Sequence, residues 1–298
     1  MFINAVLFSK SRVFLLKTQS QATLFAQKSI YLSRRMRKSM DIDARIDELL
    51  ANLKPITLDE MKEIRLMNRT DTKFVTNKET LVRLLELAEG KYYAQFHYGA
   101  KIANYMTTYW DTDGHLFYME HHNGHAPRQK VRVRTYIDSD DTFLEVKTKN
   151  NHGRTKKKRV AVPSQQITGE NGNEEFLQEK VHLGIADIHP TVRNQFHRIT
   201  LVNYGKTERL TIDYDVHFHN FETEKDANVG PIVIIELKRD GNVYSPVLDI
   251  LRQLRIKPLG FSKYCIGSVM TNKGLKQNNF RERMVLLGKI AGQRLQAK

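Results

Sequence analysis

Basic side chains recur at every second position in several short segments of this 298-residue chain. Residues two apart in a β-strand point to the same face of a sheet, so each segment would present a row of cations. Lysine supplies a point charge and arginine a planar fork, and both bind phosphate oxygens. The pattern therefore predicts strands whose shared face holds a polyanion.

Six segments show this alternation, and in most of them apolar residues occupy the positions between the charges. The charged positions are Arg69, Asp71 and Lys73; Arg128, Lys130, Arg132 and Arg134; Glu145, Lys147 and Lys149; Lys156 and Lys158; Arg209, Asp213 and Asp215; and Glu236 and Lys238. The carboxylates of Glu145 and Glu236 are hard oxygen ligands of the kind that Mg²⁺ or Mn²⁺ prefers. The chain has no glycine-rich phosphate loop, so side chains would have to hold the phosphates.

A charged face can also lie in water, which is ordinary for an antiparallel sheet. Six largely basic strands make that alternative less favourable, because repulsion among many like charges destabilises a sheet unless an anion lies between them. A closed sheet with this face inward would form a basic tunnel. We expect such a tunnel and a polyanionic ligand.

Hydrophobic periodicity places the elements that must carry these residues. Period two predicts strands at 69–75, 104–110, 115–120, 128–137, 142–149, 156–163, 196–203, 208–217 and 231–239. Apolar spacing and capping signals predict helices over 41–53, from Thr57, from Thr76 to Gly90, from Ser245 and over 280–295. We expect one α+β domain, a mainly antiparallel sheet with flanking helices.

The composition is that of a folded chain, with 40% hydrophobic residues and a formal net charge of +15. A single cysteine, Cys265, excludes an internal disulfide framework and any multi-cysteine metal site. No run of apolar residues is long enough for a transmembrane helix. His121, His122 and His125 are close in sequence, but Asn123–Gly124 is a turn signal, so we expect no metal site there.

Several segments together resemble the VTC domain, the polyphosphate polymerase branch of the triphosphate tunnel metalloenzymes. The matching segments are Leu66–Phe74, Tyr105–Thr112, Tyr118–Gly124, Arg128–Tyr136, Phe143–Asn150, Gly153–Arg159, Arg209–Asp213, Ile235–Lys238 and Gly260–Tyr264. They occur in one order over about residues 60–275. The resemblance implies a closed antiparallel β-barrel tunnel of about eight strands, with His121 in a hairpin. The first strand carries Arg69 and Lys73 in place of the Glu-x-Glu-x-Lys opening of other branches, which favours the polymerases.

The resemblance also implies the residues of the site. Those acting on phosphate would be Lys73, Arg132, Arg134, Lys147, Lys158, Arg198, Arg209 and Lys263. Those binding substrate would be Arg69, Arg128, Lys130, Lys149, Lys156 and Ser262. Glu236 matches the family's metal-binding glutamate, and Glu145 is either a second metal ligand or an ion-pair partner of Lys147 or Arg132.

Some of these assignments stay open. The phosphate ligand among Lys156, Lys157 and Lys158 is uncertain by one residue. The choice between Arg193 and Arg198 is open in the same way. Asp213 would support Arg209 without binding metal. These alternatives differ only in which face of a strand each side chain occupies.

The domain boundaries follow from charge and resemblance. Residues 1–40 hold eight basic residues and no acid, which fits a start at Met36 or Met40, a disordered tail, or a targeting segment. The tunnel domain would span 41–275, with a C-terminal helix over 276–298. That helix would cap a tunnel mouth, rest on a membrane surface, or pack on the barrel.

The implied activity is transfer of the γ-phosphate of ATP to a growing polyphosphate chain, assisted by Mn²⁺ or Mg²⁺. A terminal phosphate titrates near about pH 6 and needs no dedicated base. The rival functions are a triphosphate hydrolase of the same fold and a non-catalytic subunit that binds polyphosphate or nucleic acid. Stacking platforms for single strands are not evident, so we expect no specific nucleic-acid partner. We expect a cytoplasmic protein, either free or peripheral at a membrane beside a membrane protein that receives the polymer.

Overall fold

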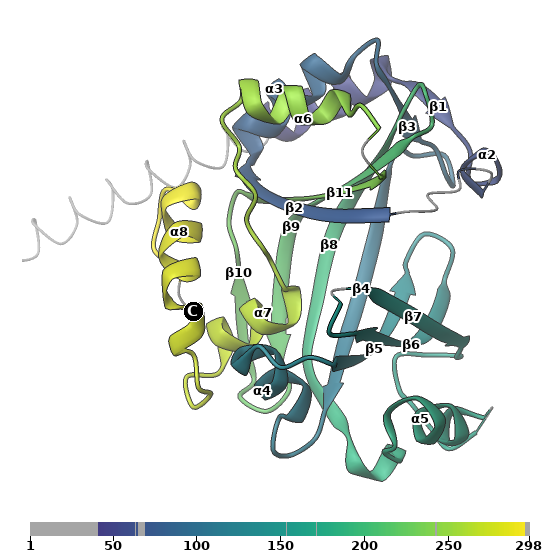
Figure 1. Ribbon diagram of the computed structural model, residues 1–298, viewed down its shortest axis with the longest axis vertical. Coiled ribbons are helices and arrows are strands. Elements are labelled where there is room, and N and C mark those ends of the chain that lie inside the picture. Colours follow the sequence, from purple (N-terminus) through teal and green to yellow (C-terminus); the bar gives the residue numbers. More distant parts are fainter. Residues whose placement is uncertain are drawn as a thin grey trace, which may run out of the picture. The chain divides into compact units, whose positions relative to one another are not determined.

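The computed structural model describes residues 41–62, 64, 69–152, 154–170, 172–241 and 243–295 (Figure 1). Only the backbone is described at Arg69, Thr70 and Asp240, and the expected extension over 1–40 lies outside the described residues. The chain divides into two compact units, Met1–Glu48 and Leu49–Lys298. Residues 41–48 of the first unit are helical, and residues 49–52 begin the second unit in the same conformation.

The second unit combines one large sheet with seven α-helices in its described part, which confirms the expected α+β class. Its strands are β1 (Lys54–Ile56), β2 (Arg69–Asn77), β3 (Tyr92–Gln95), β4 (Ile102–Asp111), β5 (Arg128–Tyr136), β6 (Asp141–Lys149), β7 (Thr155–Ala161), β8 (His189–Asn203), β9 (Glu208–Asn220), β10 (Lys225–Asn228) and β11 (Ile232–Asp240). Its helices are α2 (Leu58–Lys62), α3 (Lys78–Ala88), α4 (Leu116–Asn123), α5 (Asn173–Val181), α6 (Pro246–Gln253), α7 (Lys263–Thr271) and α8 (Arg281–Ala291), with 3₁₀ turns η1 (Ile185–Asp187) and η2 (Asn278–Phe280). None of the described helices is long and apolar enough to cross a membrane.

The main path of the sheet is antiparallel throughout, in the order β2-β11-β9-β8-β4-β5-β6-β7. The short strands β3 and β10 pair with β8 and β9, and β1 pairs with β3 in parallel. Strand direction turns progressively along the path, as the usual twist requires (Figure 1). The end strands β2 and β7 do not pair with each other over their described residues, so the closed barrel is not confirmed.

Apolar side chains cover one face of the charged strands β5, β6, β9 and β11. Val131 and Val133 of β5 and Leu144 of β6 are buried and belong to a core that includes Phe176 and Leu177 of α5. Helices α3 and α6 contact each other, and α3 packs on β2 and β11. Burial of these faces directs the intervening charged residues of β2, β5, β6 and β11 to the opposite face.

Helix α7 packs tightly on β8 and β9. A Cβ atom on Gly267 would lie 2.6 Å from a ring carbon of Phe218 and 3.0 Å from Val192, so only glycine allows this approach. The tight packing sets the position of Ser262 and Lys263, where the helix begins. Its first turn lies beside the charged strands as a result. The sequence pattern did not predict this helix.

Helix starts were predicted well where the signal is local. Thr57 and Glu60 form the expected capping box, with N–H to side-chain distances of 2.8 and 3.3 Å. Helix α3 is capped by Asn77, one residue after the expected Thr76, and its Oδ1 accepts from the Thr80 amide at 3.0 Å. Helix α6 begins at Pro246, directly after Ser245 as expected.

The predicted strand at 115–120 is wrong, because these residues belong largely to helix α4. The Asp111 carboxylate accepts from the backbone amides of Phe117 and Tyr118 at 2.9 Å, which satisfies the start of this helix. That capping group lies six and seven residues away, so local periodicity does not reveal it. His121 consequently lies in a helix and not in the expected hairpin.

Candidate functional site: a converging anion-binding face

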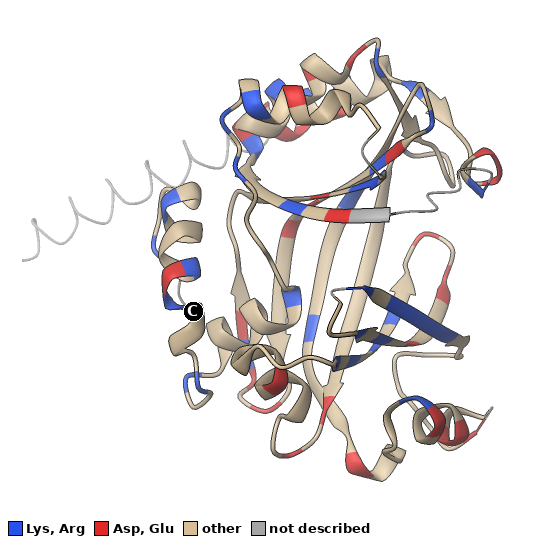
Figure 2. Ribbon diagram, viewed as in Figure 1, with Lys and Arg blue, Asp and Glu red and all other residues tan. Residues whose placement is uncertain are grey.

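Strand register places the predicted cations on one face. Residues directly opposite each other in antiparallel strands share a face. Lys130 lies opposite Lys147, and Lys73 lies opposite Glu236. Figure 2 shows Lys and Arg on β2, β5, β7, β8, β11 and the start of α7. The alternation read from the sequence therefore corresponds to one basic surface over β2, β5, β6 and β11.

The two halves of this face converge although β2 and β7 do not pair over their described residues. Lys73 of β2 donates its Nζ proton to the carbonyl of Phe261 at 3.0 Å. Lys130 of β5 donates to Oγ of the next residue, Ser262, at 2.9 Å. Strands that are five places apart in the sheet thus reach neighbouring residues of one segment.

Glu145 holds the first ion-pair cluster. Its carboxylate is fully buried, and Oε2 accepts from Nε and Nη2 of Arg132 at 2.8 and 2.6 Å. Oε1 accepts from Nζ of Lys157 at 2.8 Å. Burial alone would raise the pKa of Glu145, but Arg132, Arg134 and Lys157 lower it to about 2. Both oxygens are occupied by cations, so the geometry is that of the ion-pair alternative with Arg132 as partner.

Asp213 holds the second ion-pair cluster. Its carboxylate accepts from Nε and Nη2 of Arg198 at 2.6 and 2.8 Å, and it also pairs with Nζ of Lys263. Burial opposes ionisation, yet the two cations hold the pKa of Asp213 well below its usual range. The expected support of Arg209 is not among these contacts. Asp213 instead fixes one cation of β8 and the first residue of α7.

Glu236 is a carboxylate of this face that stays partly accessible. Its side chain is 19% exposed, with Oε1 2.9 Å from Nζ of Lys238 and Oε2 3.7 Å from Nζ of Lys73. Burial favours the neutral acid, but Lys238, Lys73 and Lys147 keep the pKa of Glu236 well below its usual range. The group is therefore an anion among cations at neutral pH.

A divalent cation fits this place only together with substrate. No group of three His, Cys, Asp or Glu side chains suited to a metal occurs in the described part of the chain. Magnesium is commonly bound by one or two carboxylates while phosphate oxygens and water complete its octahedron. Glu236 supplies one ionised oxygen ligand of that kind.

Lys147 and Lys130 are cations without a carboxylate partner among the described residues. Burial first, and then the charges of Arg132 and Lys73, lower the pKa of Lys147 to about 7, against an opposing effect of Glu236. Burial and Lys73 also lower the pKa of Lys130. A bound anion between these ammonium groups would relieve the repulsion.

The other predicted cations of this face lie toward its ends. Arg134 is buried and donates to Oγ1 of Thr107 at 3.1 Å. Arg209 lies opposite Lys238. Arg128 lies opposite Lys149, and its Nη1 donates to the His125 carbonyl at 3.1 Å. The side chain of Arg69 lies outside the described residues.

The face predicted for Lys156 and Lys158 is wrong. Lys157 lies opposite Lys147 and Arg159 lies opposite Glu145, so these two residues share the charged face and their neighbours point away. The basic residues of β7 follow one another without apolar alternation, so the sequence does not show which of them face the same side. The turn sets the register, through a 3.0 Å hydrogen bond from the Asn150 amide to the Arg154 carbonyl.

The ambiguity between Arg193 and Arg198 is also settled. Arg193 lies opposite Thr108, and its guanidinium carbon is 4.8 Å from the centre of the Phe221 ring. Arg198 lies beside Asp213, with its guanidinium carbon 4.8 Å from the Tyr105 ring centre. Arg198 is therefore the arginine of β8 that belongs to the charged face.

Tyr109 is a residue of this face that was not among the expected site residues. Burial would raise the pKa of its phenol, but the cations Arg132, Lys130 and Arg134 together lower it. Its ring stacks on Tyr264 with 4.9 Å between centroids. Tyr105 and Tyr109 share strand parity and therefore a face. This spacing was the signal in the sequence that could have identified Tyr109.

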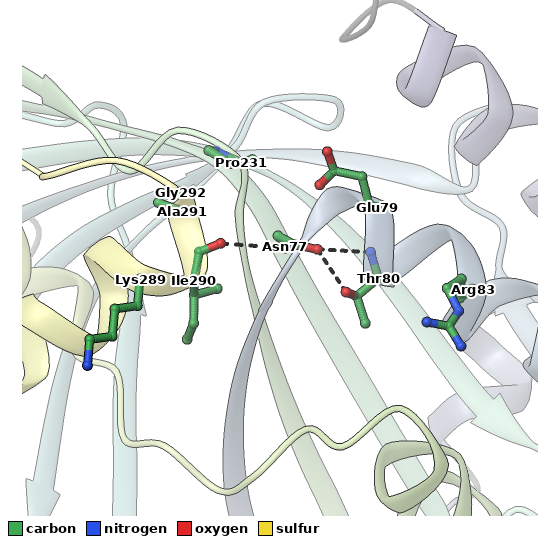
Figure 3. A pocket seen from close by; sticks show the side chains of 9 residues that line it. All are labelled: Asn77, Glu79, Thr80, Arg83, Pro231, Lys289, Ile290, Ala291 and Gly292. Carbon is green, nitrogen blue, oxygen red and sulfur yellow. Dashed lines mark hydrogen bonds between the residues drawn. The ribbon is translucent and has the colours of Figure 1, made fainter.

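A hollow between α3 and α8 lies apart from this face (Figure 3). Asn77 Nδ2 donates to the Ile290 carbonyl at 3.5 Å, while its Oδ1 accepts from Thr80. None of the residues expected to bind phosphate lines it. The hollow joins two helices and contributes nothing to the charged face.

The comparison with family models agrees with the sequence resemblance. The family model described as the VTC domain matches residues 68–272. No curated protein matches. Similar solved structures include a Hippeastrum protein described as an adenylyl cyclase candidate with a dominant triphosphatase activity (TM-score 0.46, 14% identity, 68% of this chain and 96% of that one). Others are a candidate adenylate cyclase from Bacillus halodurans (TM-score 0.43, 15% identity, 66% and 96%) and an RNA triphosphatase from Schizosaccharomyces pombe (TM-score 0.27, 8% identity, 82% and 95%).

Proposed function

The chain belongs to the VTC domain family, and from this premise we propose that it is an ATP-dependent polyphosphate polymerase. The observation that supports this best is the unbroken cation row of β5, which runs from Arg134 through Arg132 and Lys130 to Arg128. Seven strand residues span about 20 Å, which is longer than one triphosphate group. A row of that length suits a polymer.

The substrate would lie against cations of two kinds. Arg132 and Arg198 are held by buried carboxylates, so their forks are oriented before an anion arrives. Lys73, Lys130 and Lys147 supply point charges. Phosphoryl transfer depends on such neutralisation and on in-line positioning more than on covalent help.

Glu236 is the residue that would hold a divalent ion, and the ion would neutralise charge on the nucleotide phosphates. An oxygen of the terminal chain phosphate forms a bond to the γ-phosphorus, while the bond from that phosphorus to the β–γ bridging oxygen breaks and ADP leaves. The attacking phosphate is largely ionised above about pH 6, so no general base is required.

We propose that enclosure of the substrate comes from residues 259–262 and not from pairing between β2 and β7. The amide of Leu259 donates to the Lys73 carbonyl at 2.9 Å. Phe261 and Ser262 accept hydrogen bonds from Lys73 of β2 and Lys130 of β5. This segment therefore spans the opening between the two halves of the charged face. Location at a membrane and a membrane partner remain predictions.

Incubation of the purified protein with ATP and Mn²⁺ tests the proposal. A polymerase yields long polyphosphate and ADP, a hydrolase yields orthophosphate, and a binding subunit consumes no ATP. Lys73→Ala and Glu236→Gln each should lower the rate by about a hundredfold or more. The exposed Lys62 offers a control, since Lys62→Ala should leave the rate unchanged. Full activity in both site variants would overturn the assignment.

A further inference from the structure

The segment between α7 and α8 lies beyond the part of the chain that matches the family, yet it is firmly attached to α4. Tyr118 donates its hydroxyl proton to the Lys276 carbonyl at 2.8 Å. Asn279 Nδ2 donates to the His122 carbonyl at 2.8 Å. The Phe280 ring packs on Tyr118 and His122, with centroids 6.1 and 5.6 Å apart. These contacts determine where α8 begins.

The attachment brings a cation of α8 to the charged face. Nη2 of Arg283 lies 3.9 Å from the position that a Cβ atom would take on Gly260. The next two residues, Phe261 and Ser262, accept hydrogen bonds from Lys73 and Lys130. Three consecutive residues are thus each approached by a cation from a different element, namely α8, β2 and β5.

His121 of α4 completes this cluster. Its Nδ1 atom is buried and has no hydrogen-bond partner among the described residues. Burial first, and then the charges of Lys130, Arg128, Arg283 and Lys73, lower the pKa of His121 to about 2. The ring is therefore neutral, with a polar atom that lacks a partner beside several cations.

We propose that Arg283 and His121, with Arg128 and Lys130, form a subsite for a long polyphosphate chain at the α4–α8 end of the charged face. This inference rests on the proposed polymerase function and extends it to Arg283, which lies outside the matched family region. The row Arg132, Lys130, Arg128 leads along β5 toward this end. A triphosphate among Arg132, Arg198 and Glu236 would end before Arg128 and Arg283, whereas a longer chain would reach them.

The charge of the cluster identifies the ligand. After burial, the charges of Lys130, Arg128, Arg283 and Lys73 all lower the pKa of His121, so the surroundings of this ring are cationic. Repeating phosphates match cations spaced two residues apart on a strand. No aromatic stacking platform is needed for such a ligand, which separates it from a nucleic-acid strand.

Affinity measurements by titration calorimetry with tripolyphosphate and with long-chain polyphosphate test the subsite. Arg283→Ala should weaken long-chain binding by about tenfold, and by at least about five times more than it weakens tripolyphosphate binding. Arg283→Lys should restore part of the loss, because charge remains and the fork is lost. The slope of log affinity against log salt should become shallower by about one for the long chain.

Arg281 is the matched control, because it is an exposed arginine on the same helix. Arg281→Ala should change neither affinity. The subsite is wrong if Arg283→Ala weakens the binding of both ligands equally, or weakens neither. It is also wrong if single-stranded nucleic acid binds through Arg283 as tightly as polyphosphate does. Wild-type protein that binds long chains through Arg283 but makes none from ATP would refute the polymerase and leave the subsite standing.

Discussion

The charged face has two regions that hold their cations differently. In the arginine region, Arg132 and Arg198 each donate two hydrogen bonds to a buried carboxylate, that of Glu145 or Asp213. Despite burial, these carboxylates raise the pKa of both guanidinium groups. In the lysine region, which consists of Lys130 and Lys147, the pKa shift has the opposite direction. Burial and like charges lower the pKa of Lys147 to about 7.

The difference separates folding from binding. The arginine region is electrostatically complete without a ligand, so it should contribute to the stability of the free protein and orient its forks in advance. The lysine region carries uncompensated charge, which costs stability until an anion binds. Substitutions and pH changes that act on one region or the other test this division.

Removing a carboxylate from the arginine region should destabilise the protein strongly. Glu145→Gln leaves Arg132, which is 14% exposed, without its counter-charge, and we expect a loss of about 3 kcal/mol in the free energy of unfolding. Urea denaturation measures it. Asp59→Asn, which breaks an exposed pair with Lys62, should have no measurable effect. If both variants unfold at the same urea concentration, the ion pair does not hold this region together.

Removing a cation from the lysine region should weaken binding without lowering the stability of the free protein. Lys147→Met should weaken tripolyphosphate binding by about tenfold or more, while the ligand-free protein keeps or gains up to about 1 kcal/mol of stability. Calorimetry and denaturation on one preparation give both values. Lys158→Met, on the other face, is the control for the loss of one charge. A clear loss of stability in Lys147→Met would remove the distinction between the regions.

Raising the pH should affect binding and stability in opposite directions. The pKa values of Lys147 and Lys263, about 7 and about 8, lie below their usual range, mainly through burial. Above these values the ammonium groups of the free protein lose protons, so affinity for tripolyphosphate should fall between about pH 7 and 9, and binding should take up protons. These lysines bind more protons when unfolded, so their contribution makes the ligand-free protein more stable as pH rises.

Titrations at pH 8 in two buffers with different ionisation enthalpies measure the proton uptake. Lys147→Met should lower the uptake, because one titrating group is gone. Uptake that is absent in wild type would show that these lysines are already charged before the anion binds.

The smallest expected effect tests the register of β7. Lys157→Ala should weaken tripolyphosphate binding by about threefold, because Lys157 shares the face of Glu145 and is partly exposed. Lys158→Ala should leave the affinity within error. The reverse order would place β7 one residue out of register.

Several features of this site could be read from the sequence because they depend on local patterns. The cation row of β5 was predicted with its face, since Val131 and Val133 alternate with the charges and identify the buried side. The capping box at Thr57 was likewise visible. The family resemblance was carried by ordered short motifs, and the family match over 68–272 confirms it.

Other features depended on contacts between distant segments. Helix α4 was mistaken for a strand because its start is satisfied by Asp111 through the fold and not by an adjacent capping residue. The pairing of Asp213 with Arg198 and Lys263 joins three elements. No spacing along the chain encodes that choice.

The amino-acid sequence alone determined the chemistry of this protein: rows of cations with a few acids, on strands whose other face is apolar. It did so because the pleat of a strand converts alternation into two faces without help from the rest of the chain. The tertiary structure alone decided which cations are paired with carboxylates and which are left for a ligand. That outcome depends on strand register and helix placement, which bring charges from distant segments within hydrogen-bonding distance.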